Sequence, residues 1–184
     1  MNLSIGHKAP DFKTKDQNGN EVSLSTLKGK KLILFFYPKD MTPGCTAEAC
    51  NLRDNYKALQ KAGYEIFGVS SDDEKTHLKF IDKEKLPFRL LADVDKKVHE
   101  KYGTWVEKSM YGRKYMGTAR VTYVIDEKGI IKEIIEKVDT KNHAEQILSN
   151  HVNSLKNIIS NKKAVILNDA QKARKKVVKK ISKN

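Results

Sequence analysis

Length, composition and charge already exclude several classes of protein. The chain has 184 residues, 39% of them hydrophobic and 32% charged, which suits one domain with a proper core and leaves no segment apolar enough to span a membrane. Two cysteines are too few for the disulfide framework of a small secreted protein, and the formal net charge of +13 at pH 7 is unevenly spread along the chain.

The first elements are predicted to be a hairpin and a buried strand. Residues 12–14 and 21–23 flank an Asn-Gly pair at 18–19, which is a strong hairpin signal. Residues 31–37 (KLILFFY) form a short apolar run rich in aromatic and branched side chains, typical of a buried strand. Pro38 ends this strand.

A helix is predicted to follow, beginning after the turn at Pro43 and Gly44 and ending near Lys61. Its apolar positions recur at steps of three and four residues: Cys45, Ala49, Leu52, Tyr56 and Leu59. Cys45 therefore falls in the first helical turn, where free backbone N–H groups and the helix dipole favour a thiolate over a thiol. The alternative is that the cysteines are small buried hydrophobes, which fits Cys50 better than Cys45 because of the polar flanks of the latter.

The remaining elements alternate between strands and helices. They are a strand at 64–70, a helix at 73–86, a short strand at 88–91, a short helix at 94–102, a hairpin at 120–126 and 130–136, and a helix from His143. This alternation predicts an α/β fold with helices on both faces of a sheet.

Both cysteines lie in the segment 37–50 (YPKDMTPGCTAEAC), five positions apart. They cannot close a structural zinc site alone, because such a site takes four Cys or His ligands and no histidine lies near. Redox chemistry on one thiolate with the other as its partner, or two inert thiols, are the interpretations that remain.

The segment resembles the peroxidatic motif of the peroxiredoxins, in particular the thioredoxin-dependent group called PrxQ or bacterioferritin comigratory protein. That family carries a proline, a threonine and a cysteine spaced as Pro38, Thr42 and Cys45 are here, and many members have a resolving cysteine where Cys50 stands. The similarity continues through residues 105–112 and 115–126. It covers about the first 150 residues and implies a thioredoxin-like fold, with a central mixed sheet flanked by helices.

The resemblance implies a role for each of these residues. Cys45 would attack a hydroperoxide and become a sulfenic acid. Thr42 would offer its hydroxyl to the peroxide and the sulfur, and Pro38 would shield the site from water. Arg120 would hold Cys45 as thiolate and donate to the peroxide oxygens, since a guanidinium stays charged and offers several donors. The alternatives are an ordinary helix N-cap for Thr42 and a solvated surface charge for Arg120.

The resemblance also implies an intramolecular disulfide between Cys45 and Cys50, reduced by thioredoxin or a similar dithiol, with no cofactor or metal. In an intact helix, residues five apart are about 7.5 Å apart along the axis and roughly 140° apart around it. A disulfide needs Cα atoms within roughly 7 Å, so the first helical turns must unwind. The alternative is a thioredoxin-fold module that exchanges disulfides or binds partners without peroxidase activity, but such modules use a Cys-x-x-Cys pair.

Other polar and aromatic residues give weaker signals. The histidines share no spacing and are expected on solvated helix faces: His77, His99, His143 and His151, with His7 in the N-terminal arm. Acidic residues at 72–74 are expected at a helix start rather than in a metal site. Trp105, Tyr111 and Tyr115 are expected either to line a site or partner surface, or to form a packed loop.

We expect a domain boundary near residue 150, with a peroxiredoxin domain at 1–150 and a basic amphipathic extension at 151–184. The extension holds ten Lys or Arg and one acid, so +9 of the total charge lies there. Its apolar residues fall mostly at helical steps: Val152, Leu155, Ile159, Ile166, Ala170, Ala173, Val177 and Ile181. It is either a solvated, frayed extension or a weak, non-specific attachment to an anionic surface, nucleic acid or acidic lipid headgroups.

Compartment and assembly follow from the same observations. Residues 1–6 lack the apolar stretch of a secretory signal, and a thiol pair that cycles belongs where reductants are kept. We therefore expect a cytoplasmic enzyme. Members of the family that the chain resembles are often monomers, so we expect a monomer.

Overall fold

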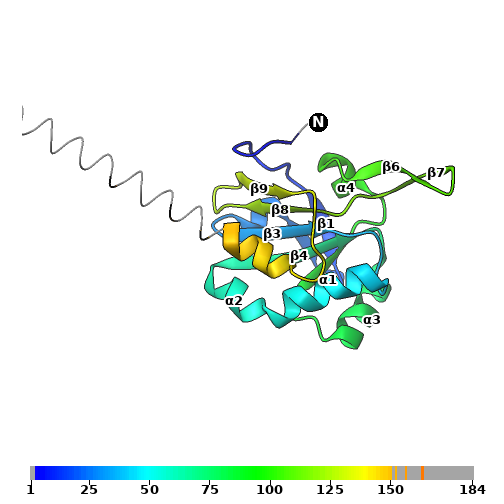
Figure 1. The fold of residues 1–184 in the computed structure, drawn as a ribbon, viewed down its shortest axis with the longest axis horizontal. Helices are drawn as coiled ribbons and strands as arrows, with labels where there is room; N and C mark the ends of the chain where they lie inside the picture. The colour runs from blue at the N-terminus through cyan, green and yellow to red at the C-terminus, as the bar shows by residue number, and fades with distance from the viewer. Residues whose placement is uncertain (1–2, 151, 153–155, 157–162, 164–184) are drawn as a thin grey trace, which may run out of the picture. The chain divides into compact units, whose positions relative to one another are not determined.

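A mixed β-sheet flanked by helices confirms the predicted α/β, thioredoxin-like fold (Figure 1). The computed structural model describes residues 3–150, 152, 156 and 163. Within them one sheet contains β1 (Lys13–Asp16), β2 (Glu21–Ser23), β3 (Lys31–Phe36), β4 (Tyr64–Ser70), β5 (Arg89–Ala92), β8 (Val121–Ile125) and β9 (Ile131–Ile135). The strand order is β2-β1-β5-β4-β3-β8-β9. Strands β3, β4 and β5 run parallel, and the remaining pairings are antiparallel.

Strand β3 lies inside the sheet, between β4 and β8, and is apolar after Lys31 because both of its faces are covered. Phe35 packs edge-on against Phe88 on one face, the same face on which Tyr37 contacts Phe80 of α3 (Glu74–Glu84). Phe36 points the other way and packs against Tyr102, which follows α4 (Lys97–Lys101). The chain therefore leaves β3 from a fully buried position, directly before the residues of the predicted site.

The helix after β3 begins at the predicted place but is interrupted. It consists of α1 (Pro43–Asp54) and α2 (Tyr56–Lys61), separated at Asn55. The Asn55 amide donates from Nδ2 to the Asn51 carbonyl at 2.9 Å, and its backbone φ and ψ are −101° and 9°. Such side-chain bonds to the backbone compete with helix continuation, which accounts for the break.

A protruding hairpin replaces the packed loop considered for residues 105–118. β6 (Trp105–Met110) pairs with β7 (Arg113–Thr118) outside the main sheet (Figure 1). Its turn residues Tyr111 and Gly112 both have positive φ, as a tight hairpin turn requires. Tyr111 is 98% exposed, so the packed-loop interpretation is wrong for the tip.

The expectation of solvated histidines is wrong for His77, His99 and His143, which are all fully buried. His77 Nδ1 lies 2.7 Å from Asp40 Oδ2, and His99 Nδ1 lies 2.5 Å from Asp93 Oδ2. Each ring is accommodated in the core because a carboxylate is buried beside it. His7 is exposed, and His151 is outside the described residues.

The predicted domain boundary near residue 150 remains a prediction. Contacts divide the chain into units after Glu145, and residues 143–150 are helical, as expected from His143 onward. The described positions 152, 156 and 163 are helical too, but the other residues predicted to form the basic extension are outside the description. Over the part of the chain that the structure describes, no helix is long and apolar enough to cross a membrane.

Candidate active site

The two cysteines of the predicted site, Cys45 and Cys50, lie on one continuous helix, α1, and both are free thiols. Pro43 occupies the first turn, where its missing N–H costs nothing, and Cys45 follows within the same turn. The first N–H groups of a helix have no intrahelical acceptor, so the Cys45 sulfur lies where negative charge is favoured. Cys45 is 2% exposed, whereas Cys50 is half-buried.

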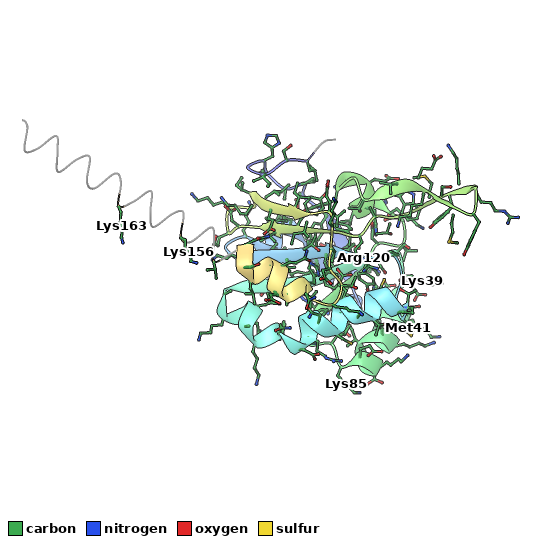
Figure 2. All side chains as sticks on the ribbon, viewed as in Figure 1. Lys39, Met41, Lys85, Arg120, Lys156 and Lys163 are labelled. Atoms are coloured by element: carbon green, nitrogen blue, oxygen red, sulfur yellow. The ribbon has the colours of Figure 1, made fainter. Side chains whose placement is uncertain are left out.

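Arg120 reaches the Cys45 sulfur from the position directly before β8, the strand that pairs with β3. The register of β3 and β8 pairs Phe36 with Val121, which places Arg120 beside the point where the chain leaves β3. Its Nη2 donates to Cys45 Sγ at 3.3 Å. In the view of Figure 2, Arg120 is labelled at the same end of the domain as Lys39 and Met41, which belong to the loop that precedes α1. This contact does not fit the alternative of a free, solvated charge.

The same guanidinium also binds a buried carboxylate that the sequence did not single out. Arg120 Nη1 donates to Glu48 Oε2, and the Glu48 side chain is fully buried. Burial opposes the charge of Arg120, but the anionic neighbours Glu48 and Cys45 raise its pKa above the ordinary value. Glu48 follows Cys45 by three residues, and this helical spacing is the signal that could have identified it.

Thr42 and Pro38 both lie in the short connection between β3 and α1. Thr42 is the N-cap residue of α1 by position, but its side chain makes no capping bond. Instead, its hydroxyl donates to the Lys39 carbonyl at 3.0 Å, which leaves the oxygen free to accept. Pro38 is half-buried where β3 ends.

A buried network holds this connection in place. Asp40 is 3% exposed and accepts from the Tyr37 hydroxyl at 2.6 Å, while its other oxygen contacts His77. The Asp40 backbone N–H donates to Asp72 Oδ2 at 2.9 Å. Burial, reinforced by the Asp40 charge, raises the pKa of Tyr37 well above its ordinary value, so the phenol remains a donor. The loop that carries Thr42 is thus fixed by core polar groups.

Cys50 has a different environment from Cys45. Its thiol lies 3.5 Å from Glu84 Oε2 at the end of α3, and Arg53 Nη1 donates to the Glu84 carbonyl at 2.6 Å. Burial raises the pKa of Cys50, and the Glu84 carboxylate raises it further against the opposing effect of Arg53. One cysteine therefore faces a cation and the other an anion.

Comparisons with known families and known proteins agree on the relatives of this chain. A family model described as the AhpC/TSA family matches residues 5–134. The chain is 47% identical over 148 residues to a putative peroxiredoxin bcp of Coxiella burnetii, covering 80% of this chain and 98% of that protein. It is 44% identical to peroxiredoxin Bcp of Bacillus subtilis, covering 80% of this chain and 94% of the relative.

The chain belongs to the AhpC/TSA family. Its solved structural neighbours include peroxiredoxin Q of Xanthomonas campestris, at a TM-score of 0.72 and 32% identity, covering 76% of this chain and 89% of that one. The resemblance to the Bcp and PrxQ group is therefore confirmed, and the protein is a thiol peroxidase. The alternative of a disulfide-exchange module without peroxidase activity is not supported.

A second cation lies near the peroxiredoxin site and was also missed. Lys108 of β6 donates from Nζ to the Thr118 carbonyl at 2.5 Å. Burial lowers the pKa of Lys108, and the charge of Arg120 lowers it further, while the Cys45 sulfur acts in the opposite direction. No spacing rule connects Lys108 to Cys45, because Lys108 belongs to β6, an element far along the chain from α1.

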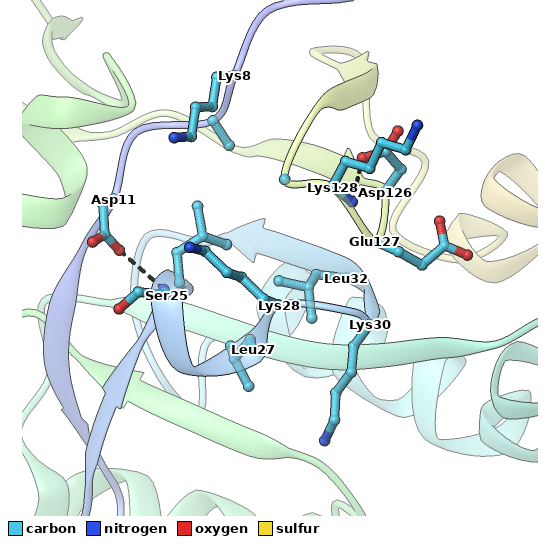
Figure 3. Close-up of a pocket in the computed structure, with 13 residues that line it drawn as sticks. Lys8, Asp11, Ser25, Leu27, Lys28, Lys30, Leu32, Asp126, Glu127 and Lys128 are labelled. Atoms are coloured by element: carbon cyan, nitrogen blue, oxygen red, sulfur yellow. Dashed lines mark hydrogen bonds between the residues drawn. The ribbon is translucent and has the colours of Figure 1, made fainter.

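The cavity in Figure 3 is separate from this site. Its volume is about 100 Å³, and none of the predicted site residues lines it. It lies between the N-terminal segment, the 3-10 helix at Leu24–Leu27 and the turn before β9, and Asp11 accepts there from the Ser25 N–H at 3.2 Å. Among the described residues, no group of three or more His, Cys, Asp or Glu is arranged to hold a metal ion.

The environment of Cys50 predicts its pH behaviour. In a Cys45→Ser variant, alkylation of Cys50 by iodoacetamide should have a pH midpoint above about 8.5, the value of an unperturbed thiol. Because the folded-state pKa is raised, the thiol stabilises the fold below the unfolded pKa, and this contribution is lost as the pH rises through the folded value. Adding Glu84→Gln should lower the midpoint, since it keeps an acceptor oxygen but removes the charge.

The matched control is Asp82→Asn, an exposed acid on the same helix that pairs with Lys85. This change should leave the alkylation midpoint where it was. A Glu84→Gln midpoint equal to that of the Asp82→Asn protein would contradict the assigned effect of Glu84.

Proposed function

We propose that Cys45 is the peroxidatic cysteine, that Cys50 is the resolving cysteine, and that Arg120 and Thr42 bind the hydroperoxide. The contact between Arg120 Nη2 and Cys45 Sγ at 3.3 Å is the observation that supports this assignment most strongly. A guanidinium at that distance favours the thiolate, which is the reactive form of the sulfur.

The first step oxidises Cys45. Its thiolate attacks one oxygen of the hydroperoxide, the S–O bond forms as the O–O bond breaks, and the leaving alkoxide or hydroxide takes a proton from water. Arg120 donates to the oxygens as negative charge builds on the leaving group. The Thr42 oxygen accepts the O–H hydrogen of the peroxide, since its own hydrogen is already donated to Lys39.

The second step joins the two cysteines after α1 partly unwinds. The Cys50 sulfur attacks the sulfenic sulfur, the S–S bond forms as the S–OH bond breaks, and the hydroxyl leaves as water with the Cys50 proton. A neutral sulfenic acid no longer attracts Arg120 as a thiolate does, so oxidation itself weakens the hold on the first turn of α1.

The second half of α1 is anchored at several points, which favours unwinding from the first turn. Asn51 Nδ2 donates to the Lys141 carbonyl at 2.6 Å, and Asn51 Oδ1 accepts from the Ala144 N–H at 2.8 Å. Arg53 is bonded to the end of α3. We therefore propose that Cys50 stays near its place while Cys45 moves.

Substrate, reductant and setting complete the proposal. A related bacterioferritin comigratory protein of Xanthomonas campestris is described by its alkyl peroxide reduction activity, so hydrogen peroxide and organic hydroperoxides are both proposed substrates. Thioredoxin or a similar dithiol would reduce the disulfide in a cytoplasmic setting. Because both cysteines lie on one helix of one chain, the cycle requires no second copy, and we propose a monomer.

Cysteine variants test these assignments. Peroxide consumption should be measured with thioredoxin and its reductase for the wild type, Cys45→Ser and Cys50→Ser. Cys45→Ser should abolish turnover because a hydroxyl is too weak a nucleophile at neutral pH. Cys50→Ser should consume one equivalent of peroxide and then stop at the sulfenic acid. Sustained turnover by Cys45→Ser would overturn the assignment of the nucleophile.

For residues 151–184 we propose weak electrostatic attachment to an anionic polymer or membrane surface, supported by their charge of +9. Deleting residues 160–184 should leave peroxidase activity unchanged. It should also abolish a salt-sensitive shift on mixing with DNA or with vesicles of acidic lipid. Binding that survives the deletion, or that does not weaken as salt is raised, would contradict this proposal.

A further inference from the structure

Arg120 is shared by two anions, and this raises a geometric problem. One of its terminal nitrogens contacts the Cys45 sulfur and the other contacts Glu48 Oε2. An arginine and a carboxylate prefer a bidentate pair with two parallel N–H···O bonds. If Glu48 offered both oxygens to Arg120, it would draw Nη2 away from the sulfur.

The second oxygen of Glu48 faces His143. Glu48 Oε1 lies 3.1 Å from His143 Nδ1, and both side chains are fully buried. Among the described residues, neither ring nitrogen of His143 makes a hydrogen bond of regular geometry, so the 3.1 Å approach to Glu48 Oε1 is the polar contact of the ring. The polar contact that accounts for burying this imidazole is therefore the one with Glu48.

The position of His143 is fixed by its surroundings. Its ring packs edge-on against Phe35 of β3, with centroids 6.5 Å apart and an interplanar angle of 84°. The two Asn51 bonds to Lys141 and Ala144 attach the chain on either side of it to α1, the helix that carries Glu48. His143 is thus held against the carboxylate from two directions.

We propose that His143 is a positioning residue for the peroxidatic site. Its Nδ1 lies beside Glu48 Oε1 and occupies the space on that side of the carboxylate, so Arg120 binds Glu48 through Oε2 alone. Nη2 then remains directed at Cys45. His143 acts on the sulfur through Glu48 and Arg120 and touches neither the peroxide nor Cys45. The proposal rests on the assignment of Cys45 as the peroxidatic cysteine.

The other charged groups around Glu48 do not replace this contact. Arg120 approaches the opposite oxygen, and Lys108 of the hairpin directs its Nζ to the Thr118 carbonyl. Cys45 contacts Arg120 rather than Glu48. Removing His143 should therefore release Oε1 to Arg120 and lower the fraction of enzyme in which Arg120 contacts the sulfur.

Three substitutions at position 143 separate positioning from simple packing. In His143→Asn the amide nitrogen takes the place of Nδ1, whereas in His143→Gln it takes a place closer to Nε2. His143→Leu removes the donor and keeps a similar volume. The second-order rate constant of the reduced enzyme with hydrogen peroxide should be measured by stopped flow from pH 5 to 9, together with thermal stability.

His143→Leu and His143→Gln should each lose at least tenfold in rate, with the midpoint of the pH–rate profile moved to higher pH because the thiolate is held less well. His143→Asn should stay within about threefold of the wild type. The matched control is His99→Gln, which removes a buried histidine paired with Asp93. It should lower thermal stability without moving the pH–rate midpoint.

Equal rates and midpoints for the Asn, Gln and Leu variants would overturn the proposal, as would an unchanged rate in His143→Leu. Cys45→Ser measured alongside separates this failure from that of the proposed function. If Cys45→Ser is inactive and the His143 variants are alike, only the role of His143 is wrong. If Cys45→Ser still reacts rapidly with peroxide, the underlying assignment is wrong.

Discussion

The contact between Arg120 and Cys45 is the interaction on which the rest of the site depends. It places a permanent cation beside a 2% exposed sulfur at the start of a helix, so charge and backbone donors act on the same atom. The sheet makes this possible because β8 runs beside β3 and brings Arg120 to the end of that strand. The arginine must serve Glu48 as well, so its orientation depends on what holds the carboxylate.

Helix α1 is subject to two opposing requirements. It must be intact to place Cys45 beside Arg120, and it must open before Cys45 can reach Cys50, because both lie on one continuous helix. Different contacts hold the two halves of the helix. The bonds of Asn51 and Arg53 fasten its second half, whereas Cys45 in the first turn is contacted by Arg120 through its sulfur.

The sequence allowed the strand, the helix start and the cysteine environment to be predicted, because apolar periodicity and a Pro-Gly turn encode them locally. The roles of Glu48 and His143 were not predicted, since their contact joins α1 to a helix start far along the chain and a lone histidine carries no spacing signal. The hairpin at 105–118 was missed because its strands are largely exposed, so no buried face gives the alternation that marks a strand. Asn55 shows that one side-chain bond can interrupt a helix whose hydrophobic stripe continues.

The most direct test of the account compares the second-order rate with hydrogen peroxide in the wild type, Arg120→Met and Arg120→Lys. Loss of a donor directed at developing negative charge costs about a hundredfold or more, so Arg120→Met should fall by that factor with its circular dichroism unchanged. Arg120→Lys should recover only part of the rate. The single ammonium of a lysine cannot contact Glu48 and the Cys45 sulfur at the same time, as the two terminal nitrogens of the guanidinium do. A rate in Arg120→Met equal to that of the wild type would contradict the account.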